Sequence, residues 1–255
     1  MLKSYAIINQ KGGVGKSTTA EALGAGLTLK GYKVLFIDLD AQGNLTYTLG
    51  ANSKGYNSLD VLTQEATAEA AIQHTDRGDI IPSTPALAGA DTAITSTGKE
   101  YRLKEALEPL KKSYDFIVID TPPALGILTI NALTACTGAV IPAQADIYSL
   151  QGISQLNQTI ETVKRYCNPA LMIEGIVLTR YTPRAIISRE VADTIEETAA
   201  QLHTKLYKTR VRDCTAIKEA QATKQSIYNY SPKSNGAADY TALTAEIIGE
   251  GEAKQ

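Results

Sequence analysis

The sequence predicts an α/β fold in which helices cover both faces of one doubly wound, mostly parallel β-sheet. Strand-like and helix-like segments alternate along the 255 residues. The strand-like segments are short and almost wholly apolar, as at residues 34–37, which suits strands that are buried on both faces of a parallel sheet. Acidic residues follow several of these segments, so polar groups would gather where the strands end. We expect residues 1–255 to form a single domain.

The individual elements are predicted from their periodicity. The first strand, at residues 5–8, leads into a glycine-rich turn and a helix at 17–30, where Leu23 and Leu27 recur at helical spacing and Gly31 ends the helix. A short strand at 79–81 interrupts the irregular stretch 51–98. Further strands are predicted at 33–38, 114–120, 139–142, 171–179 and 206–211, and further helices at 101–112, 149–166, 188–202 and 234–248.

Composition and charge exclude several classes of protein. The net charge of −2 and a pI near 5.8 argue against a protein that coats nucleic acid with a uniformly basic surface. No apolar run approaches the ~18 residues that a membrane span requires, so we expect a cytoplasmic location. The three cysteines are widely spaced and the chain has only two histidines, which gives no basis for a disulfide framework, a zinc site or a Ser-His-Asp triad.

Residues 9–19 carry the strongest functional motif. Three glycines precede a lysine and a hydroxyl residue: Gly12, Gly13, Gly15, Lys16 and Ser17. A glycine-rich turn between a strand and a helix points backbone N–H groups at one anion, normally a phosphate. The usual nucleotide-loop pattern, G-x-x-x-x-G-K-[ST], has a glycine where this chain has Gln10. Lys11 adds a second cation, which can reach phosphates at the mouth of the loop.

This loop predicts a site for a nucleoside triphosphate and Mg²⁺. We expect its backbone N–H groups to hold the β-phosphate, and the residues concerned are Gly12, Gly13, Val14, Gly15, Lys16, Ser17 and Thr18. The Lys16 ammonium would bridge the β- and γ-phosphate oxygens, and the Ser17 hydroxyl would ligate Mg²⁺.

Three acidic residues are predicted to face this loop. Asp38 and Asp40 follow one buried strand and Asp120 ends another, and the carboxyl ends of parallel strands meet at one edge of a sheet. Asp40 is our candidate for orienting a water in line with the γ-phosphate. Asp120 is expected to hold a magnesium-bound water. Asp38 either supports this site or only ends its strand by accepting N–H bonds.

These segments resemble the deviant Walker A ATPases, and within them most closely the ParA/Soj partition ATPases. The resemblance rests on residues 11–17, 38–44 and 120–123 and continues at 128–133, 150–152 and 234–237, so it covers nearly the whole chain. It implies a P-loop NTPase-like fold and slow, partner-stimulated hydrolysis of ATP with Mg²⁺. It also implies a homodimer that closes around two ATP molecules, with Lys11 of each subunit reaching the other's phosphates. Cations are needed there because two facing triphosphates repel each other.

The resemblance further implies what the ATP-bound dimer does. It would bind double-stranded DNA without sequence preference, associate with the nucleoid, and be released when a ParB-like partner stimulates hydrolysis. Cargo would thereby be moved or spaced along the nucleoid. The short segment before the first strand lacks the helix-turn-helix extension of longer plasmid members, so operator binding is not expected.

A local excess of basic residues marks the segment that we expect to contact DNA. Residues 175–233 hold ten Lys or Arg against six Asp or Glu, a local charge of +4. The DNA-contacting candidates, each of which could equally be an ordinary solvated side chain, are Arg184, Arg189, Arg212 and Lys218. Thr179 and Arg180, at the end of a predicted strand, are the candidates for contact with the adenine base.

Other functions on this fold fit the sequence less well. A MinD-like membrane-positioning ATPase would need a basic amphipathic helix at the C-terminus, whereas residues 248–255 are acidic and broken by glycine. An iron–sulfur protein like the nitrogenase iron protein would need interface cysteines, and a tyrosine kinase of this superfamily would need a terminal tyrosine cluster; neither pattern is present. The sequence therefore favours a partition ATPase without a membrane partner, and leaves open a nucleotide-gated scaffold with negligible turnover.

Overall fold

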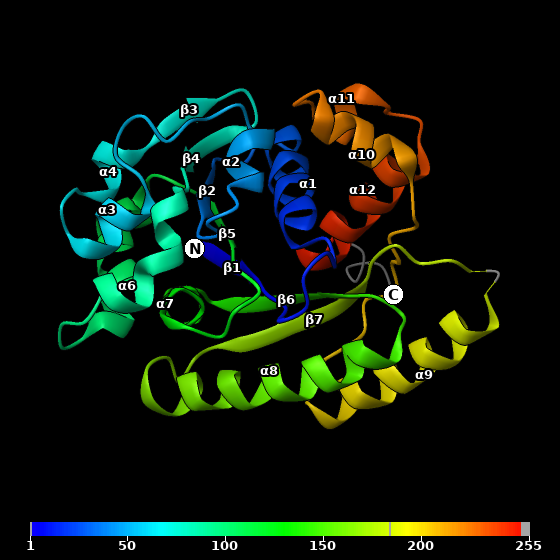
Figure 1. The fold of residues 1–255 in the computed structure, drawn as a ribbon. Helices are drawn as coiled ribbons and strands as arrows, with labels where there is room; N and C mark the ends of the chain where they lie inside the picture. The colour runs from blue at the N-terminus through cyan, green and yellow to red at the C-terminus, as the bar shows by residue number, and fades with distance from the viewer. Residues whose placement is uncertain (1, 184, 251–255) are drawn as a thin grey trace.

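The computed structural model describes residues 2–183 and 185–250, which form a seven-stranded sheet covered by helices (Figure 1). The strands lie in the order β3-β4-β2-β5-β1-β6-β7, and only β3 and β4 pair antiparallel. Their bounds are β1 (Lys3–Ile7), β2 (Val34–Asp38), β3 (Gln73–Thr75), β4 (Gly78–Ile81), β5 (Phe116–Asp120), β6 (Gly138–Ala143) and β7 (Met172–Leu178). The predicted fold class is confirmed.

Helices of very different lengths connect these strands. They are α1 (Lys16–Leu29), α2 (Asn44–Thr48), α3 (Ser58–Thr63), α4 (Ala68–Ala71), α5 (Ala90–Ala93), α6 (Arg102–Leu107), α7 (Ile127–Ala135), α8 (Ile147–Tyr166), α9 (Ile186–Gln201), α10 (Thr215–Ala222), α11 (Ile227–Tyr230) and α12 (Asn235–Ile247). Short 3-10 helices lie at Pro85–Gly89, Lys99–Tyr101 and Glu108–Lys112.

Alternate residues of the central strands point into two separate cores. Leu35 and Ile37 of β2 belong to a core that also contains apolar residues of α3, α6, α7, α8 and α9. Val34 and Phe36 pack instead with residues of α1, α10, α11 and α12. Figure 1 shows these two groups of helices on opposite sides of the sheet. Because both faces are covered, the strands are apolar throughout and do not alternate with polar residues.

The register of the central strands places the end of β1 beside two acidic residues. Asp38 of β2 lies opposite Asp120 of β5, and Asp120 in turn lies opposite Ile7, the last residue of β1. The loop that follows β1 therefore begins at the same edge, and at the same level, as both carboxylates.

The prediction of a regular strand at 206–211 is wrong. Leu206 forms an isolated bridge with Ile176 of β7, and the Val211 N–H donates to the Leu178 carbonyl at 2.8 Å. Between these contacts the backbone leaves the sheet, because the N–H groups of Lys208 and Thr209 donate to the Glu246 carboxylate on α12, at 2.7 and 2.9 Å. A side chain thus replaces the ladder that a strand would need.

The predicted helices also differ from those observed. The helix expected at 101–112 is divided into α6 and two 3-10 helices, and Pro109 lies near the start of the second of them, where its missing N–H interrupts the α-helical ladder. The helices α7, α10 and α11 are not predicted from the sequence. The eight residues of α10 matter most for function, because they form one wall of the cavity described below.

Candidate functional site

A cavity of about 510 Å³ opens at the edge of the sheet where the strands end. The glycine-rich loop forms its floor, the segment from Asp40 through α2 forms one wall, and α10 forms part of another. Its lining residues are Gly12, Gly13, Gly15, Lys16, Ser17, Thr18, Asp40, Gln42, Asn44, Tyr47, Thr48, Pro123, Arg180, Gln221 and Ala222. A site of this size can enclose a nucleotide.

The loop has the backbone conformation that an anion cradle requires. Gly13 and Gly15 have φ angles of +76° and +87°, which residues with a side chain rarely adopt. Gly15 is the N-cap of α1 and has no side chain to accept the first N–H groups of the helix, so these groups are available to an anion. The Val14 carbonyl accepts a hydrogen bond from the Thr179 hydroxyl at 2.7 Å, which fixes the loop against the end of β7.

Lys16 brings a buried cation into this cavity. The residue is only 7% exposed, and its ammonium donates to the Lys11 carbonyl at 3.4 Å. Burial lowers the pKa of Lys16, while the nearby charges of Asp120 and Asp40 oppose that shift. An ammonium with so little access to water gains strongly from the approach of a phosphate.

Asp38 and Asp120 form a pair of fully buried carboxyl groups beside the loop. Neither carboxylate oxygen of Asp120 has a hydrogen-bond partner among the residues that the structure describes. Burial raises the pKa of Asp120 well above its usual range, and the neighbouring Asp38 raises it further, against smaller lowering effects from Ser17 and Lys16. An unpartnered buried carboxyl group that faces a phosphate loop fits a role beside a bound cation.

Asp38 is held more firmly than Asp120. Its carboxylate accepts from the N–H and the hydroxyl of Thr46, at 2.8 and 2.7 Å, and from the N–H of Asp40 at 3.1 Å. Burial raises the pKa of Asp38 to about 6 although these donors lower it. Its hydrogen bonds thus connect β2 to α2. They fit both interpretations drawn from the sequence, support of the site and acceptance of N–H bonds at the end of the strand.

The residues suit Mg²⁺ only together with a nucleotide. Across residues 2–183 and 185–250, no three His, Cys, Asp or Glu side chains are grouped so that they could hold a metal ion by themselves. Magnesium prefers few protein ligands, several waters and phosphate oxygens. Ser17 and, through a water, Asp120 are the groups that would complete such a site beside the loop.

Asp40 lies in the cavity and is fixed by its own backbone. Its N–H donates to Asp38, and its carbonyl accepts from the Gly43 N–H at 2.8 Å and from the Ser83 hydroxyl. One carboxylate oxygen accepts from the Gln42 N–H at 3.0 Å. The carboxylate is therefore rigidly placed opposite the loop, where it could orient a water.

Lys11 and the two adenine candidates have different surroundings. The Lys11 ammonium points away from the lining of the cavity to Asp146, at 2.5 Å, and to Gln144, at 3.4 Å. Partial burial raises the pKa of Asp146, but the hydrogen bond and charge of Lys11 outweigh this and lower it. Thr179 is buried against the loop, whereas Arg180 is exposed and lines the cavity.

The four residues that the sequence predicts to contact DNA differ in their surroundings. Arg184 lies outside the described residues. Arg189 on α9 and Lys218 on α10 are exposed. The Nζ atom of Lys218 lies 3.8 Å from the Oδ1 atom of Asp213. Arg212 is held by Asp239 on α12, which accepts from its Nε and Nη2 atoms at 2.9 and 2.6 Å.

Two walls of the cavity are formed by helices that the sequence did not predict as part of the site. Tyr47 and Thr48 of α2 and Gln221 and Ala222 of α10 line it. Gln221 also donates to the Thr18 hydroxyl at 2.8 Å. Both helices are too short to give a periodic signal, and α10 reaches the loop only through the tertiary fold.

Comparison with known proteins identifies the family. Residues 2–173 match the family described as AAA domain. The chain is 43% identical to the sporulation initiation inhibitor protein Soj of Bacillus subtilis, over 98% of this chain and 100% of Soj. It is 37% identical to the chromosome partitioning protein ParA of Myxococcus xanthus, over 95% of this chain and 86% of that protein. The chain belongs to the ParA/Soj family of partition ATPases.

A solved structure supports the cofactors of this ParA/Soj-type protein. Cobyrinic acid a,c-diamide synthase from Mycobacterium smegmatis, with bound ADP and magnesium, superposes with a TM-score of 0.83 at 31% identity, covering 100% of this chain and 97% of the other. The chain is thus a partition or positioning ATPase that uses ATP and Mg²⁺, as the sequence predicted. Each helix within the described ranges is too short or too polar to cross a lipid bilayer.

Because Lys16 supplies a buried positive charge to the cavity, Lys16→Ala should weaken the binding of Mg·ATP by about 100-fold or more, the equivalent of two charge-assisted hydrogen bonds. Equilibrium binding of a fluorescent ATP analogue measures this. Lys3→Ala, at the opposite edge of the sheet, is the matched control. Undiminished affinity in a folded Lys16→Ala variant would show that the cavity does not bind the triphosphate.

Proposed function

We propose that this chain is an ATP-dependent dimerising switch that binds DNA without sequence preference and positions cargo on the nucleoid. The observation that carries the proposal is the placement of Lys11. Its ammonium lies at the rim and is turned away from the cavity of its own chain. A long, flexible lysine side chain in this place can reach outward, so it is suited to a nucleotide that a second copy holds.

The cavity supplies the parts that hydrolysis needs. Its loop N–H groups and Lys16 would hold the phosphates, and Ser17 and Asp120 would hold Mg²⁺ and its water. Bound magnesium neutralises charge on the phosphate oxygens. Asp40 would orient the attacking water, because its carboxylate is fixed by backbone hydrogen bonds at the opposite wall.

A second copy is the partner that the rim beside Lys11 suits. Ile147 and Tyr148, the first residues of α8, follow Asp146 directly and are 67% and 71% exposed. Exposed apolar side chains next to a charged contact are typical of protein interfaces. If two copies came together over this rim, Lys11 of each chain would move toward the nucleotide of the other. Its positive charge would there offset the repulsion between the two facing triphosphates.

Two of the proposed DNA contacts, Arg189 and Lys218, lie on helices that begin near the edge of the sheet that holds the ATP cavity. The segment before α9 begins where β7 ends, and Val211, shortly before α10, is hydrogen-bonded to the last residue of β7. Arg189 and Lys218 therefore project from elements that start at the carboxyl edge of the sheet. Dimerisation would double this set of cations and so strengthen otherwise weak phosphate contacts. A ParB-like partner would then stimulate hydrolysis and release the DNA.

Sedimentation with duplex DNA of arbitrary sequence, in the presence of ATP, ADP or no nucleotide, tests the proposal as a whole. We expect retention only with ATP. Retention on anionic phospholipid vesicles instead of DNA would favour the MinD-like alternative. ATP-dependent retention without measurable turnover would identify a nucleotide-gated scaffold.

If Asp40 orients the attacking water, Asp40→Ala should still bind ATP and dimerise, but its turnover should fall by about 100-fold or more. Release of phosphate at saturating Mg·ATP measures this. Asp40→Asn, which keeps an acceptor for the Gln42 N–H, separates loss of the charge from loss of local structure. Normal turnover in Asp40→Ala would mean that another group orients the water.

If Lys11 acts on the partner's nucleotide, Lys11→Ala should remain a monomer in ATP while each chain still binds nucleotide, because its own cavity is intact. Light scattering measures the molecular mass. The exposed Lys54→Ala is the control for loss of a surface charge. If Lys11→Ala dimerised as strongly as the wild type, this would contradict the proposal that Lys11 contacts the nucleotide of the partner chain.

If exposed cations at the carboxyl edge bind phosphates, the double variant Arg189→Glu/Lys218→Glu should lose DNA retention and keep its basal ATPase rate. The slope of log affinity against log salt should fall by about two, since two phosphate contacts are removed. Lys3→Glu/Lys33→Glu makes the same charge change at the opposite edge and should have little effect. An equal loss of DNA retention in both double variants would indicate that the overall charge of the protein attracts DNA and that no defined surface contacts it.

A further inference from the structure

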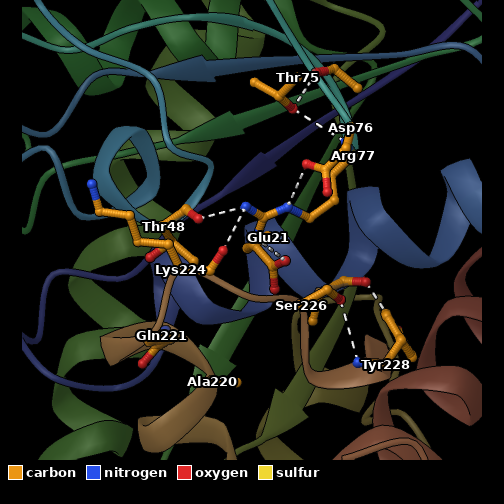
Figure 2. A network of polar contacts seen from close by, with 12 residues as sticks. Glu21, Thr48, Thr75, Asp76, Arg77, Ala220, Gln221, Lys224, Ser226 and Tyr228 are labelled. Atoms are coloured by element: carbon orange, nitrogen blue, oxygen red, sulfur yellow. Dashed lines mark hydrogen bonds and ion pairs between the residues drawn. The ribbon is translucent and has the colours of Figure 1, made fainter. Parts of the chain in front are cut away.

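The turn between β3 and β4 contains a buried arginine that no step described so far uses. Arg77 is only 7% exposed, and Figure 2 shows its side chain extended between α1 and the end of α10. Its Nη1 atom donates to Glu21 of α1 at 3.2 Å. Its Nη2 atom donates to two backbone carbonyls, those of Thr48 at 2.7 Å and Lys224 at 3.1 Å.

These three contacts join three elements that line the ATP cavity. Glu21 lies one turn beyond the phosphate loop residues of α1, Thr48 is the last residue of α2, and Lys224 is the second residue after α10. The contacts to α2 and to Lys224 go to main-chain atoms, so they fix the position of the backbone and not of one side chain. Arg77 is thus a single link between the floor of the cavity and two of its walls.

A second contact joins the α2 wall to the segment after α10, closer to the solvent. The Lys224 ammonium lies 4.4 Å from the centre of the Tyr47 ring, and Tyr47 lines the cavity. Lys224 has a φ of +54°, so its backbone is held in a conformation that is unfavourable for lysine. The Arg77 hydrogen bond to its carbonyl helps to hold that conformation.

The middle of α2 is fixed by a different group. Asp38 accepts two hydrogen bonds from Thr46, the third of the five residues of this helix. The catalytic side of the cavity, with Asp38 and Asp40, is therefore anchored independently of Arg77. Loss of Arg77 would release the walls far from the reacting phosphate and leave the acidic groups in place.

The arrangement is not one that stability alone explains. Burial raises the pKa of Glu21 to about 7, although the charge and hydrogen bond of Arg77 lower it. Replacing a buried ion pair with apolar residues of similar size is often neutral or stabilising. The Arg77–Glu21 pair is better explained as a link that fixes the distances between the cavity walls, because a planar guanidinium can hold three acceptors at fixed positions at once.

We propose that Arg77, oriented by Glu21, is a positioning residue that sets the spacing of the α2 and α10 walls and thereby the affinity of the cavity for ATP. The inference concerns nucleotide binding alone. It holds whether or not the dimer binds DNA, so a failure of the partition proposal would leave it intact.

Three variants of the full chain test the proposal. Arg77→Lys keeps a charge beside Glu21, but its single nitrogen cannot span the three acceptor positions that the two guanidinium nitrogens reach. The double variant Glu21→Met/Arg77→Met removes the link and avoids an unpaired buried charge. Asp76→Asn is the matched control, because Asp76 contacts Arg77 at 3.3 Å from the solvent side and is 74% exposed. Binding of a fluorescent ATP analogue, kcat and KM for Mg·ATP, and the melting temperature are measured for each.

We expect Arg77→Lys and the double variant to bind the analogue about tenfold more weakly, the equivalent of one or two lost hydrogen bonds, with KM raised in parallel. The kcat at saturating ATP should stay within about twofold, since groups that bind substrate and transition state equally affect KM and not kcat. The Asp76→Asn variant should match the wild type.

Two results would overturn the proposal. One is wild-type affinity in a folded double variant, which would mean that the walls keep their spacing without Arg77. The other is a loss of affinity in Arg77→Lys that tracks a lowered melting temperature and is restored in the double variant, which would make the pair a purely structural feature. If Arg77→Lys does not fold, the affinity of the folded double variant alone decides whether the proposal holds.

Discussion

The structure depends on a concentration of charge inside the protein at one edge of the sheet. The parallel register of β2 and β5 puts Asp38 directly beside Asp120, and both are excluded from water. Lys16 is also buried and supplies a nearby cation, but Asp120 still has no hydrogen-bond partner within the described chain. Such a site favours a ligand that brings its own metal ion and its own negative charge together. Mg·ATP has both properties.

The glycine-rich loop by itself does not define the cavity. The middle of α2 is fixed to β2 through Thr46 and Asp38, and its last residue is fixed through the Thr48 carbonyl to Arg77. The C-terminal end of α10 is held by the Gln221 contact to the loop and by the contact of Arg77 with the Lys224 carbonyl. The phosphate-binding part of the site is thus local in sequence, whereas the α10 wall depends on residues more than a hundred positions away.

This division explains what the sequence could predict. The loop and the acids at the strand ends were identified because glycine spacing and apolar runs are local signals, and the sheet order then brings them together. The walls could not be found in the same way. The segment 206–211 has the apolar pattern of a strand, but Glu246 takes the N–H groups that the sheet would need. Arg212 resembles a free surface cation, yet its partner Asp239 is on a helix 27 residues later. Such pairings are decided by tertiary contacts that composition does not reveal.

The contact between Lys11 and Asp146 has a consequence for reversibility. Both side chains are about one-third exposed, at 31% and 33%, so water can replace either partner. Pairs at this level of exposure contribute at most ~1 kcal/mol, and less as salt is added. In the proposed dimer, the lysine would therefore lose little on leaving its own chain for another, and would regain as little on its return. Exchange of this contact would then have a low thermodynamic cost in both directions, so the free energy of the triphosphate, and not the resting contact, would determine which state is occupied.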